Sequence, residues 1–394
     1  MEKKQQRMRL LKGGLVYAPE SLGRKDILTG GGKILAIGDD LNPSGIDLDV
    51  VSAEGRIVAP ALVDSHVHIC GGGGEGGFSS RTPEIQISSF YRGGICAAVG
   101  VLGTDGTTRH TAGLLAKARG LTEDGVDCWI MTGSYQIPTP TLTGSVCDDI
   151  VLIDRIIGCG EICLSDHRSS HPSMEDLIHL VSEARRGGML SGKCGLVNIH
   201  LGDGREGLSP LRKLVELSEI PLSQLQPTHV NRNGSLFEEG MAYAREGGYV
   251  DFTTSTTPRF IADGEVPAAE ALSRCFENGV PLEHISFSSD GQGSLPLFDD
   301  LGNLAGMKVA EVSTLLDSFR EAVRDWNIPV EKALHVVSTN PAERYKLSGK
   351  GRLRPGMDAD LLLLDSEDLS LDSLYAGGRL VVQEGVPVVK GSFE

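Results

Sequence analysis

The chain has 394 residues, of which 40% are hydrophobic and 5% aromatic, which is the composition of a globular protein with room for one large domain and a smaller one. Its formal net charge of −16 argues against partners that need an extended basic surface, namely nucleic acids and anionic membranes. An acidic small-molecule substrate remains compatible with this charge, because the arginines of a pocket decide what it binds.

Nothing in the sequence predicts export or membrane insertion. The first nine residues are basic and polar, and they lack the apolar core of a signal peptide. No apolar run is long enough to cross a bilayer. The eight cysteines are scattered without a CxxC pair, which favours reduced thiols. We therefore expect a cytoplasmic protein.

The two ends of the chain share one pattern, in which short apolar runs alternate with turn residues. Near the start these runs are 14–17, 26–28, 33–37 and 47–51, and near the end they are 359–364, 378–382 and 387–390. Such runs are typical of short β-strands. We expect the segments 1–58 and 349–394 to pair in one small β-sandwich domain, with the rest of the chain inserted as a second domain.

Between residues 59 and 348 the pattern changes to apolar strand-like runs separated by helical segments such as 173–186 and 310–326. Repeated strand-then-helix order predicts a parallel sheet with crossover helices. Eight strands are expected, at residues 59–68, 96–103, 128–135, 161–166, 196–200, 225–229, 250–253 and 285–290. Eight is the number that closes a (β/α)8 TIM-like barrel.

Polar residues close several of these strands. His66 and His68 lie two apart in the segment DSHVH, so an extended chain points both rings to one face, where they can bind one ion. By themselves they are equally compatible with two solvated histidines. His200, His229 and Asp290 also end predicted strands, however, and barrel enzymes place catalytic groups at these ends. The sequence therefore predicts a metal site there, and surface or packing roles for His110, His167, His171, His179, His284 and His335.

An HxH pair after the first strand, His after the fifth and sixth, and Asp after the eighth resemble the amidohydrolase superfamily. Within it the chain is similar to isoaspartyl dipeptidases, in order and across nearly its whole length. The segments that carry the resemblance are HVHICGGGGEGG, RTPE, GVLGTDGTTRH, TGSYQIP, TGSV, SDHRS, PTHVNRN and SSDGQGS.

The resemblance implies two Zn²⁺ ions per chain, the first held by His66, His68 and Asp290, and the second by His200 and His229. A hydroxide that bridges the ions would attack the isopeptide bond of a β-aspartyl dipeptide. Asp290 would take the proton of this nucleophile and pass one to the leaving amine. Tyr135 would help to polarise the scissile carbonyl.

A β-aspartyl dipeptide carries one ammonium and two carboxylates. By the same resemblance Glu75 would bind the ammonium, while Thr104 would help to position the aspartyl end; the carboxylates would be bound by Arg168, Arg232 and Ser294. Without the neighbouring motifs, surface ion pairs would explain the arginines equally well, and a packed aromatic would explain Tyr135. The glycine run 71–74 suits a phosphate cradle, but no GK[ST] follows it.

The sequence departs from the family at the ligand that bridges the metals. Most members use a carboxylated lysine, whereas alignment on residues 165–168 places Glu161 there, with no lysine nearby. We expect Glu161 to bridge the ions as an unmodified carboxylate, although the side chain is shorter. Wider metal spacing or an impaired site are alternatives, as is an exposed glutamate at a strand start, because Gly160 resembles an insertion and permits a register error. The loop 254–266 also differs from the family pattern.

Several functions share these metal ligands, and the fold does not choose among them. Dihydroorotase-like or hydantoinase-like ring opening and hydrolysis of N-acyl amino acids are alternatives, and so is a scaffold without catalysis. Glu75, Arg168 and Arg232 favour a small acidic dipeptide, because it needs all three charges. We expect a homo-oligomer with no nucleic-acid or membrane partner.

Overall fold

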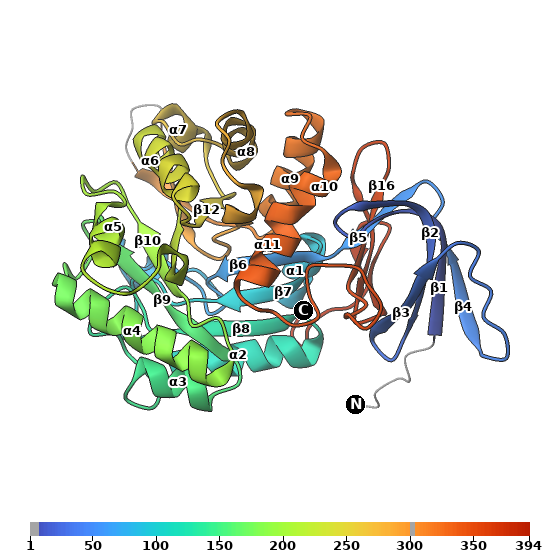
Figure 1. The fold of residues 1–394 in the computed structure, drawn as a ribbon, viewed down its shortest axis with the longest axis horizontal. Helices are drawn as coiled ribbons and strands as arrows, with labels where there is room; N and C mark the ends of the chain where they lie inside the picture. The colour runs from blue at the N-terminus through green and yellow to red at the C-terminus, as the bar shows by residue number, and fades with distance from the viewer. Residues whose placement is uncertain (1–7, 300–303) are drawn as a thin grey trace.

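The computed structural model describes residues 8–299 and 304–394. They form a curled parallel sheet covered by helices and a separate sheet built from the two ends of the chain (Figure 1). The predicted fold class, a (β/α)8 barrel with a small β-domain from both termini, is confirmed.

The barrel contains all eight predicted strands. Six of them form a parallel sheet in sequence order, and the other two form a parallel pair. β11 lies beside β12, and β13 lies beside β6, so the eight strands close into a barrel. The strands are β6 (Leu62–Val67), β7 (Ile95–Gly100), β8 (Asp127–Thr132), β9 (Ile156–Leu164), β10 (Val197–Leu201), β11 (Leu225–Thr228), β12 (Val250–Thr253) and β13 (Ile285–Ser288).

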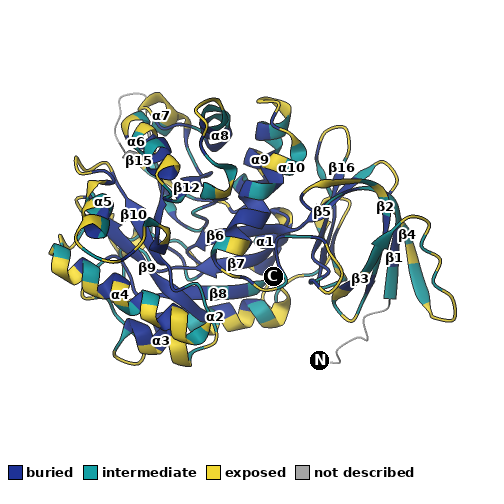
Figure 2. Cartoon of the chain, in the orientation of Figure 1, coloured by how far each residue is buried: buried dark blue, intermediate teal, exposed yellow. Residues whose placement is uncertain are grey.

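Helices cover the outside of the barrel with their buried faces inward (Figure 2). The longer ones are α2 (Thr111–Asp124), α3 (Val146–Leu152), α4 (Met174–Ser191), α5 (Ser209–Glu216), α6 (Gly234–Arg245), α8 (Ala268–Glu277) and α9 (Thr314–Arg324), and the shorter ones are α1 (Ile87–Arg92), α7 (Pro258–Ala262), α10 (Val330–Leu334) and α11 (Asn340–Arg344). Within residues 8–299 and 304–394, none of these helices combines the length and the apolarity that a membrane span requires.

Helix α4 shows how local sequence sets an element. Ser173 and Asp176 form a capping box that satisfies backbone N–H groups at its start. Leu177, Leu180, Val181 and Ala184 follow at helical spacing and are buried against the barrel. A Cβ on Gly188 would lie 2.7 Å from the Cα of Gly195, so glycine lets the last turns pack closely. The helix therefore runs five residues past the predicted end at residue 186.

The terminal sheet has nine strands and confirms that the two ends of the chain pair. Its strands are β1 (Met8–Tyr17), β2 (Ser21–Gly30), β3 (Lys33–Gly38), β4 (Leu48–Ser52), β5 (Arg56–Pro60), β16 (Leu361–Asp365), β17 (Leu371–Ala376), β18 (Arg379–Gln383) and β19 (Val386–Pro387). β5 pairs in parallel with β1 and antiparallel with β16, so it joins the N-terminal to the C-terminal strands (Figure 1). Its residues include both 58 and 59, between which the sequence placed a domain boundary.

Three features were not predicted. β5 is a strand of the terminal sheet, whereas the sequence assigned residues 59 and 60 to the first barrel strand, which begins at residue 62. β17 adds a strand to the terminal sheet, and a hairpin of β14 (Ser294–Phe298) and β15 (Leu304–Val309) follows β13 directly. The hairpin begins at a predicted substrate-binding residue, Ser294, and so brings it to the end of the barrel where the strands finish.

Candidate metal centre and active site

The carboxyl ends of five strands bring six predicted ligands together. His66 lies on β6 and His68 directly follows it, while Glu161 lies on β9 and His200 on β10. His229 follows β11, and Asp290 comes two residues after β13. Five of these six residues are classed as buried, and Asp290 is nearly so. The predicted convergence of strand ends is therefore what the structure shows.

Glu161 lies between two pairs of histidines. Its Oε1 is 2.9 Å from Nδ1 of His200 and 3.0 Å from Nε2 of His229. Its Oε2 is 3.5 Å from Nε2 of His66 and 4.0 Å from Nε2 of His68. Since the side chain is fully buried and faces all four rings, the alternative of an exposed glutamate at a strand start is excluded.

A bulge in β9 directs Glu161 toward the other ligands. Cys159 pairs with Val197 and Ile162 with Ile199, so two residues, Gly160 and Glu161, stand opposite one residue of β10. Bulges next to active sites commonly change the direction of a side chain. A Cβ on Gly160 would lie 2.7 Å from the carbonyl oxygen of the neighbouring strand, and its φ is 146°, so this position requires glycine. The bulge thus places the Glu161 carboxylate among the four histidine rings.

The arrangement of donor atoms fits divalent ions. Asp290 Oδ1 is 3.1 Å from Nε2 of His68 and 3.8 Å from Nε2 of His66. Among the described residues, His66 Nε2, Glu161 Oε2 and Asp290 Oδ1 are buried without any hydrogen-bond partner. Ligand atoms at the usual zinc distances in a tetrahedral site lie roughly 3.4 Å from one another, which matches these spacings. Buried polar atoms that converge without hydrogen-bond partners fit a group of side chains that binds a cation.

The neighbouring histidines keep the carboxylate of Glu161 ionised. Burial alone would raise the pKa of Glu161, but the charge of His66 and hydrogen bonds from His200 and His229 hold this pKa well below its usual range. Burial lowers the pKa of His66, yet Glu161 outweighs it and raises this pKa to about 9. Burial also lowers the pKa of His229 to about 3. Glu161 is therefore an anionic carboxylate, as a group that could bind a cation must be.

Hydrogen bonds to their other ring nitrogens orient two of the histidines. Nε2 of His200 is 3.0 Å from Oδ2 of Asp166, and Nδ1 of His229 is 2.6 Å from Oγ1 of Thr253. Such contacts fix the rotation of a ligand ring and raise its basicity. Asp166 and Thr253 were not predicted, although both lie at strand ends, where the rule that identified the ligands would have applied to them.

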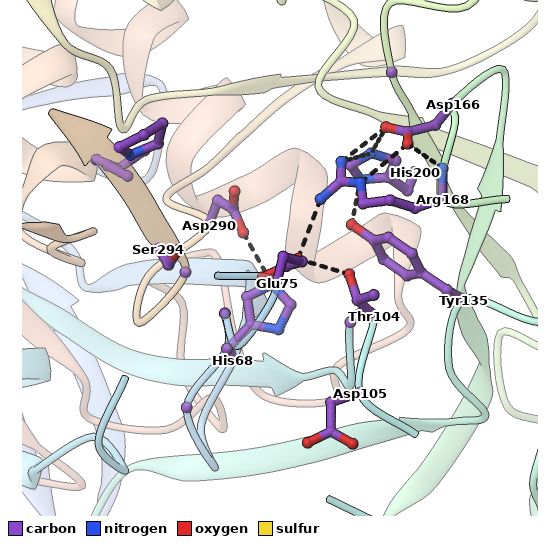
Figure 3. A pocket seen from close by; sticks show the side chains of 18 of the residues that line it. His68, Glu75, Thr104, Asp105, Tyr135, Asp166, Arg168, His200, Asp290 and Ser294 are labelled. Atoms are coloured by element: carbon purple, nitrogen blue, oxygen red, sulfur yellow. Dashed lines mark hydrogen bonds and ion pairs between the residues drawn. The ribbon is translucent and has the colours of Figure 1, made fainter. Parts of the chain in front are cut away.

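A cavity of about 240 Å³ opens above these ligands. It is lined by every residue that was predicted to bind substrate, namely Glu75, Thr104, Tyr135, Arg168, Arg232 and Ser294. Figure 3 labels Glu75, Thr104, Tyr135, Arg168 and Ser294 around it. Phe260 also lines it, because the short helix α7 lies within the loop 254–266 that departs from the family pattern. The sequence placed this loop at the active-site face, but it did not predict that Phe260 lines the cavity.

Glu75 was predicted to bind the substrate ammonium and Arg168 a substrate carboxylate, but in this structure the two side chains bind each other. Oε1 of Glu75 accepts hydrogen bonds from Thr104 Oγ1 at 2.8 Å and from Arg168 Nη1 at 3.3 Å (Figure 3). Partial burial raises the pKa of Glu75, but Thr104 and Arg168 lower it below its usual value. A ligand with both an ammonium and a carboxylate can replace this ion pair without leaving either charge unpaired.

Tyr135 is buried as a packed aromatic would be, but its hydroxyl faces the site. The phenol oxygen is 2.9 Å from Nδ1 of His200, and the Arg168 guanidinium lies 5.4 Å from the ring centre. Burial and the nearby charge of Glu161 raise the pKa of Tyr135 well above its usual value. The hydroxyl therefore stays protonated and can donate a hydrogen bond to a developing oxyanion.

Arg109 supports the glycine run next to Glu75 and was not predicted. Its guanidinium donates hydrogen bonds to the carbonyl oxygens of Cys70, Gly72, Gly73 and Thr82. The glycine run is thus held by a buried cation within the same chain, and the structure gives no support for a phosphate cradle there.

A barrel whose strand ends carry this set of histidines and carboxylates is the arrangement of an amidohydrolase. The sequence profile described as "Amidohydrolase family" matches residues 284–389. A crystal structure of the β-aspartyl dipeptidase of Fervidobacterium islandicum AW-1 in complex with β-Asp-Leu is 41% identical, covers 97% of this chain and 98% of that chain, and has a TM-score of 0.89. The chain belongs to the β-aspartyl dipeptidase family of the amidohydrolase superfamily, and it is a hydrolase of amide bonds.

More distant relatives carry other names. An allantoinase of Bacillus licheniformis is 23% identical, with 97% of this chain and 94% of the relative covered. A structure of D-hydantoinase is 19% identical, covers 98% of this chain and 97% of that chain, and has a TM-score of 0.67. At this identity the D-hydantoinase structure shows the shared fold and leaves the substrate open.

Proposed function

We propose that this protein hydrolyses the isopeptide bond of β-aspartyl dipeptides with the help of two Zn²⁺ ions. The observation that carries the proposal is the cavity in which Glu75, Arg168 and Arg232 surround the space above the metal ligands. One anionic and two cationic groups match the ammonium and the two carboxylates of such a dipeptide. The relative that was crystallised with β-Asp-Leu supports the same substrate class.

His66, His68 and Asp290 would hold one ion, and His200 and His229 the other, with Glu161 as their shared ligand. Divalent ions in such a site lower the pKa of water, so that it becomes a nucleophile near neutral pH. The resident ion is proposed as zinc because imidazole and carboxylate ligands at these spacings suit it.

Two side chains of the chain carry the remaining chemistry. Asp290 lies at the edge of the cavity, where its carboxylate can accept a proton from the attacking water and return one to the leaving amine. The hydroxyl of Tyr135 donates to the carbonyl oxygen as negative charge develops on it. Both groups are held in place before substrate arrives, which lowers the cost of reorganisation.

A substrate comparison tests this proposal. Purified protein with zinc is assayed against β-Asp-Leu, α-Asp-Leu, hydantoin and dihydroorotate. We expect hydrolysis of β-Asp-Leu with a kcat/KM at least about 10²-fold above that of each other compound. Each of the other compounds lacks one of the three charged groups of β-Asp-Leu or carries it at a different position. Faster turnover of either ring compound would replace the dipeptidase proposal with a ring-opening activity. Metal analysis with no zinc and no turnover would favour a scaffold.

Replacement of Tyr135 by phenylalanine is expected to reduce kcat for β-Asp-Leu by about 10²-fold, since one donor to the oxyanion is lost. KM is expected to change little, because the hydroxyl acts mainly in the transition state. Steady-state kinetics measure both constants. Equal kcat values for the variant and the wild type would assign Tyr135 a packing role only.

Replacement of Glu75 by glutamine is expected to reduce kcat/KM for β-Asp-Leu by about 10²-fold, because the substrate ammonium loses its charged partner. An N-acetylated β-Asp-Leu, which has no ammonium, serves as the matched substrate and is expected to be hydrolysed by both proteins at similar low rates. If the variant lost activity on both substrates to the same degree, Glu75 would act on the fold of the loop and not on the ammonium.

A further inference from the structure

Asp166 has no role in the proposed function so far, yet it contacts two groups that do. It follows the end of β9 by two residues, lines the cavity and is only 7% exposed. Figure 3 shows its carboxylate beside His200 and Arg168, with interactions drawn to both. One of these is a proposed metal ligand and the other a proposed substrate-binding residue.

The contact with His200 selects which ring nitrogen faces the metal ligands. Asp166 Oδ2 is 3.0 Å from Nε2 of His200, while Nδ1 of the same ring is 2.9 Å from Glu161 Oε1. Both carboxylates can only accept hydrogen bonds, so in a neutral ring the nitrogen that does not bind an ion carries the proton; with an ion on Nδ1 this is Nε2, which donates to Asp166. The lone pair of the neutral ring is then on Nδ1, on the side of Glu161, where an ion would be bound.

The contact with Arg168 fixes the guanidinium at the cavity. Asp166 Oδ1 accepts from the backbone N–H of Arg168 at 2.8 Å and from its Nε at 3.0 Å, and Oδ2 accepts from its Nη2 at 2.7 Å. This bidentate pair leaves Nη1 directed to Glu75 at 3.3 Å. Nη2 also lies 3.1 Å from Nε2 of His200, and both donors share Oδ2.

We propose that Asp166 is a positioning residue that couples metal binding at His200 to carboxylate binding at Arg168. Because Oδ2 accepts from both groups, neither can move without changing the hydrogen bond of the other. Loss of its charge should weaken zinc binding by about 10- to 100-fold, as partners of metal-binding histidines generally do when removed. The same loss should raise KM for an acidic dipeptide by about tenfold, since a bidentate pair that orients a guanidinium is lost.

The metal half of the proposal is tested without any activity. Asp166→Asn has the same shape as the wild type, and its zinc dissociation constant is measured by chelator competition on protein whose thermal unfolding is unchanged. His167→Ala is the matched control, because this neighbouring side chain is 89% exposed and lies 3.4 Å from Asp166 Oδ1. We expect a 10- to 100-fold larger dissociation constant in Asp166→Asn and a change below about twofold in the control.

An unchanged dissociation constant in Asp166→Asn would overturn the coupling, because His200 would then be oriented by Arg168 or Tyr135 alone. If Asp166→Asn does not fold, Asp166→Glu is measured in its place. It keeps the charge but is too long for both contacts, so weaker zinc binding is again expected, and wild-type zinc binding would contradict the proposal.

The substrate half rests on the proposed function and uses a double-mutant cycle. KM for β-Asp-Leu is measured in Asp166→Asn, Arg168→Gln and the double variant. If Asp166 acts on the substrate through Arg168, the second substitution adds less than about twofold to KM once the first is present. If the two substitutions changed KM additively, the proposed action of Asp166 on the substrate through Arg168 would be overturned. If the wild-type protein does not hydrolyse β-Asp-Leu, the proposed function fails, whereas the zinc measurement still decides the contact with His200.

Discussion

Replacement of Glu161 by alanine is expected to reduce bound zinc from about two ions per chain to one or fewer, because the residue is the shared ligand of both proposed ions. It is also expected to reduce kcat/KM for β-Asp-Leu by at least about 10³-fold, since the water that attacks the amide would no longer be activated by two ions. Metal analysis after gel filtration and steady-state kinetics measure the two effects. In the structure no other described carboxylate lies within hydrogen-bonding reach of both His200 and His229.

Glu161→Gln is the companion variant, because it keeps the shape of the side chain and removes its charge. It is expected to retain more zinc than Glu161→Ala and less than the wild type. Activity of the wild type should be the same in buffer freed of carbon dioxide and in buffer with added bicarbonate, since a glutamate needs no carboxylation. Bicarbonate dependence, or two zinc ions in Glu161→Ala, would show that another group bridges the metals.

Replacement of Asp290 by asparagine is expected to reduce kcat by about 10³-fold, because an amide cannot carry the proton from the attacking water to the leaving amine. The amide still occupies the same space, so KM for β-Asp-Leu should change by less than about threefold. Asp290 lies close to His66 and His229, but Glu161, His200 and His229 form a group of potential ligands without it, and at least one zinc ion per chain should therefore remain. Kinetics and metal analysis on the same preparation measure all three quantities.

The role of Asp290 as a proton donor is separated from its role as a ligand by the leaving group. A β-aspartyl 4-nitroanilide has a leaving group that needs less assistance from an acid than an alkyl amine does. We expect the loss in kcat to be clearly smaller for the anilide than for β-Asp-Leu. Equal losses on both substrates, together with reduced zinc, would show that Asp290 acts as a ligand alone.

The sequence by itself predicted the framework of the protein. Alternating apolar runs at both ends indicated strands that pair across the chain, and the structure places β5 between β1 and β16. The eight barrel strands were predicted because each strand is encoded by a local run of apolar residues. The ligands were predicted for a related reason: a strand that ends in His or Asp places that group at the same edge of a parallel barrel as every other strand end.

Tertiary structure decided how these residues face one another. The bulge at Gly160 and Glu161 depends on where β10 pairs with β9. The extra residue is visible in the sequence, but the direction of the Glu161 side chain is not. The register error that the sequence left open is resolved by the side chain itself, since Glu161 faces His66, His200 and His229.

Contacts between distant residues could not be predicted for the same reason. Glu75 and Arg168 are 93 positions apart, and nothing in either segment shows that the two charges pair with each other in the free protein. Asp166 lies two positions before a predicted residue, Arg168, and contacts it locally, but its contact with His200 depends on a ring carried by the next strand. Local sequence fixes which residues form a strand and where it ends, because periodicity and turn residues act within a few positions. Only the packing of the closed barrel fixes which of those ends meet, since it sets the distances between segments that are far apart in the chain.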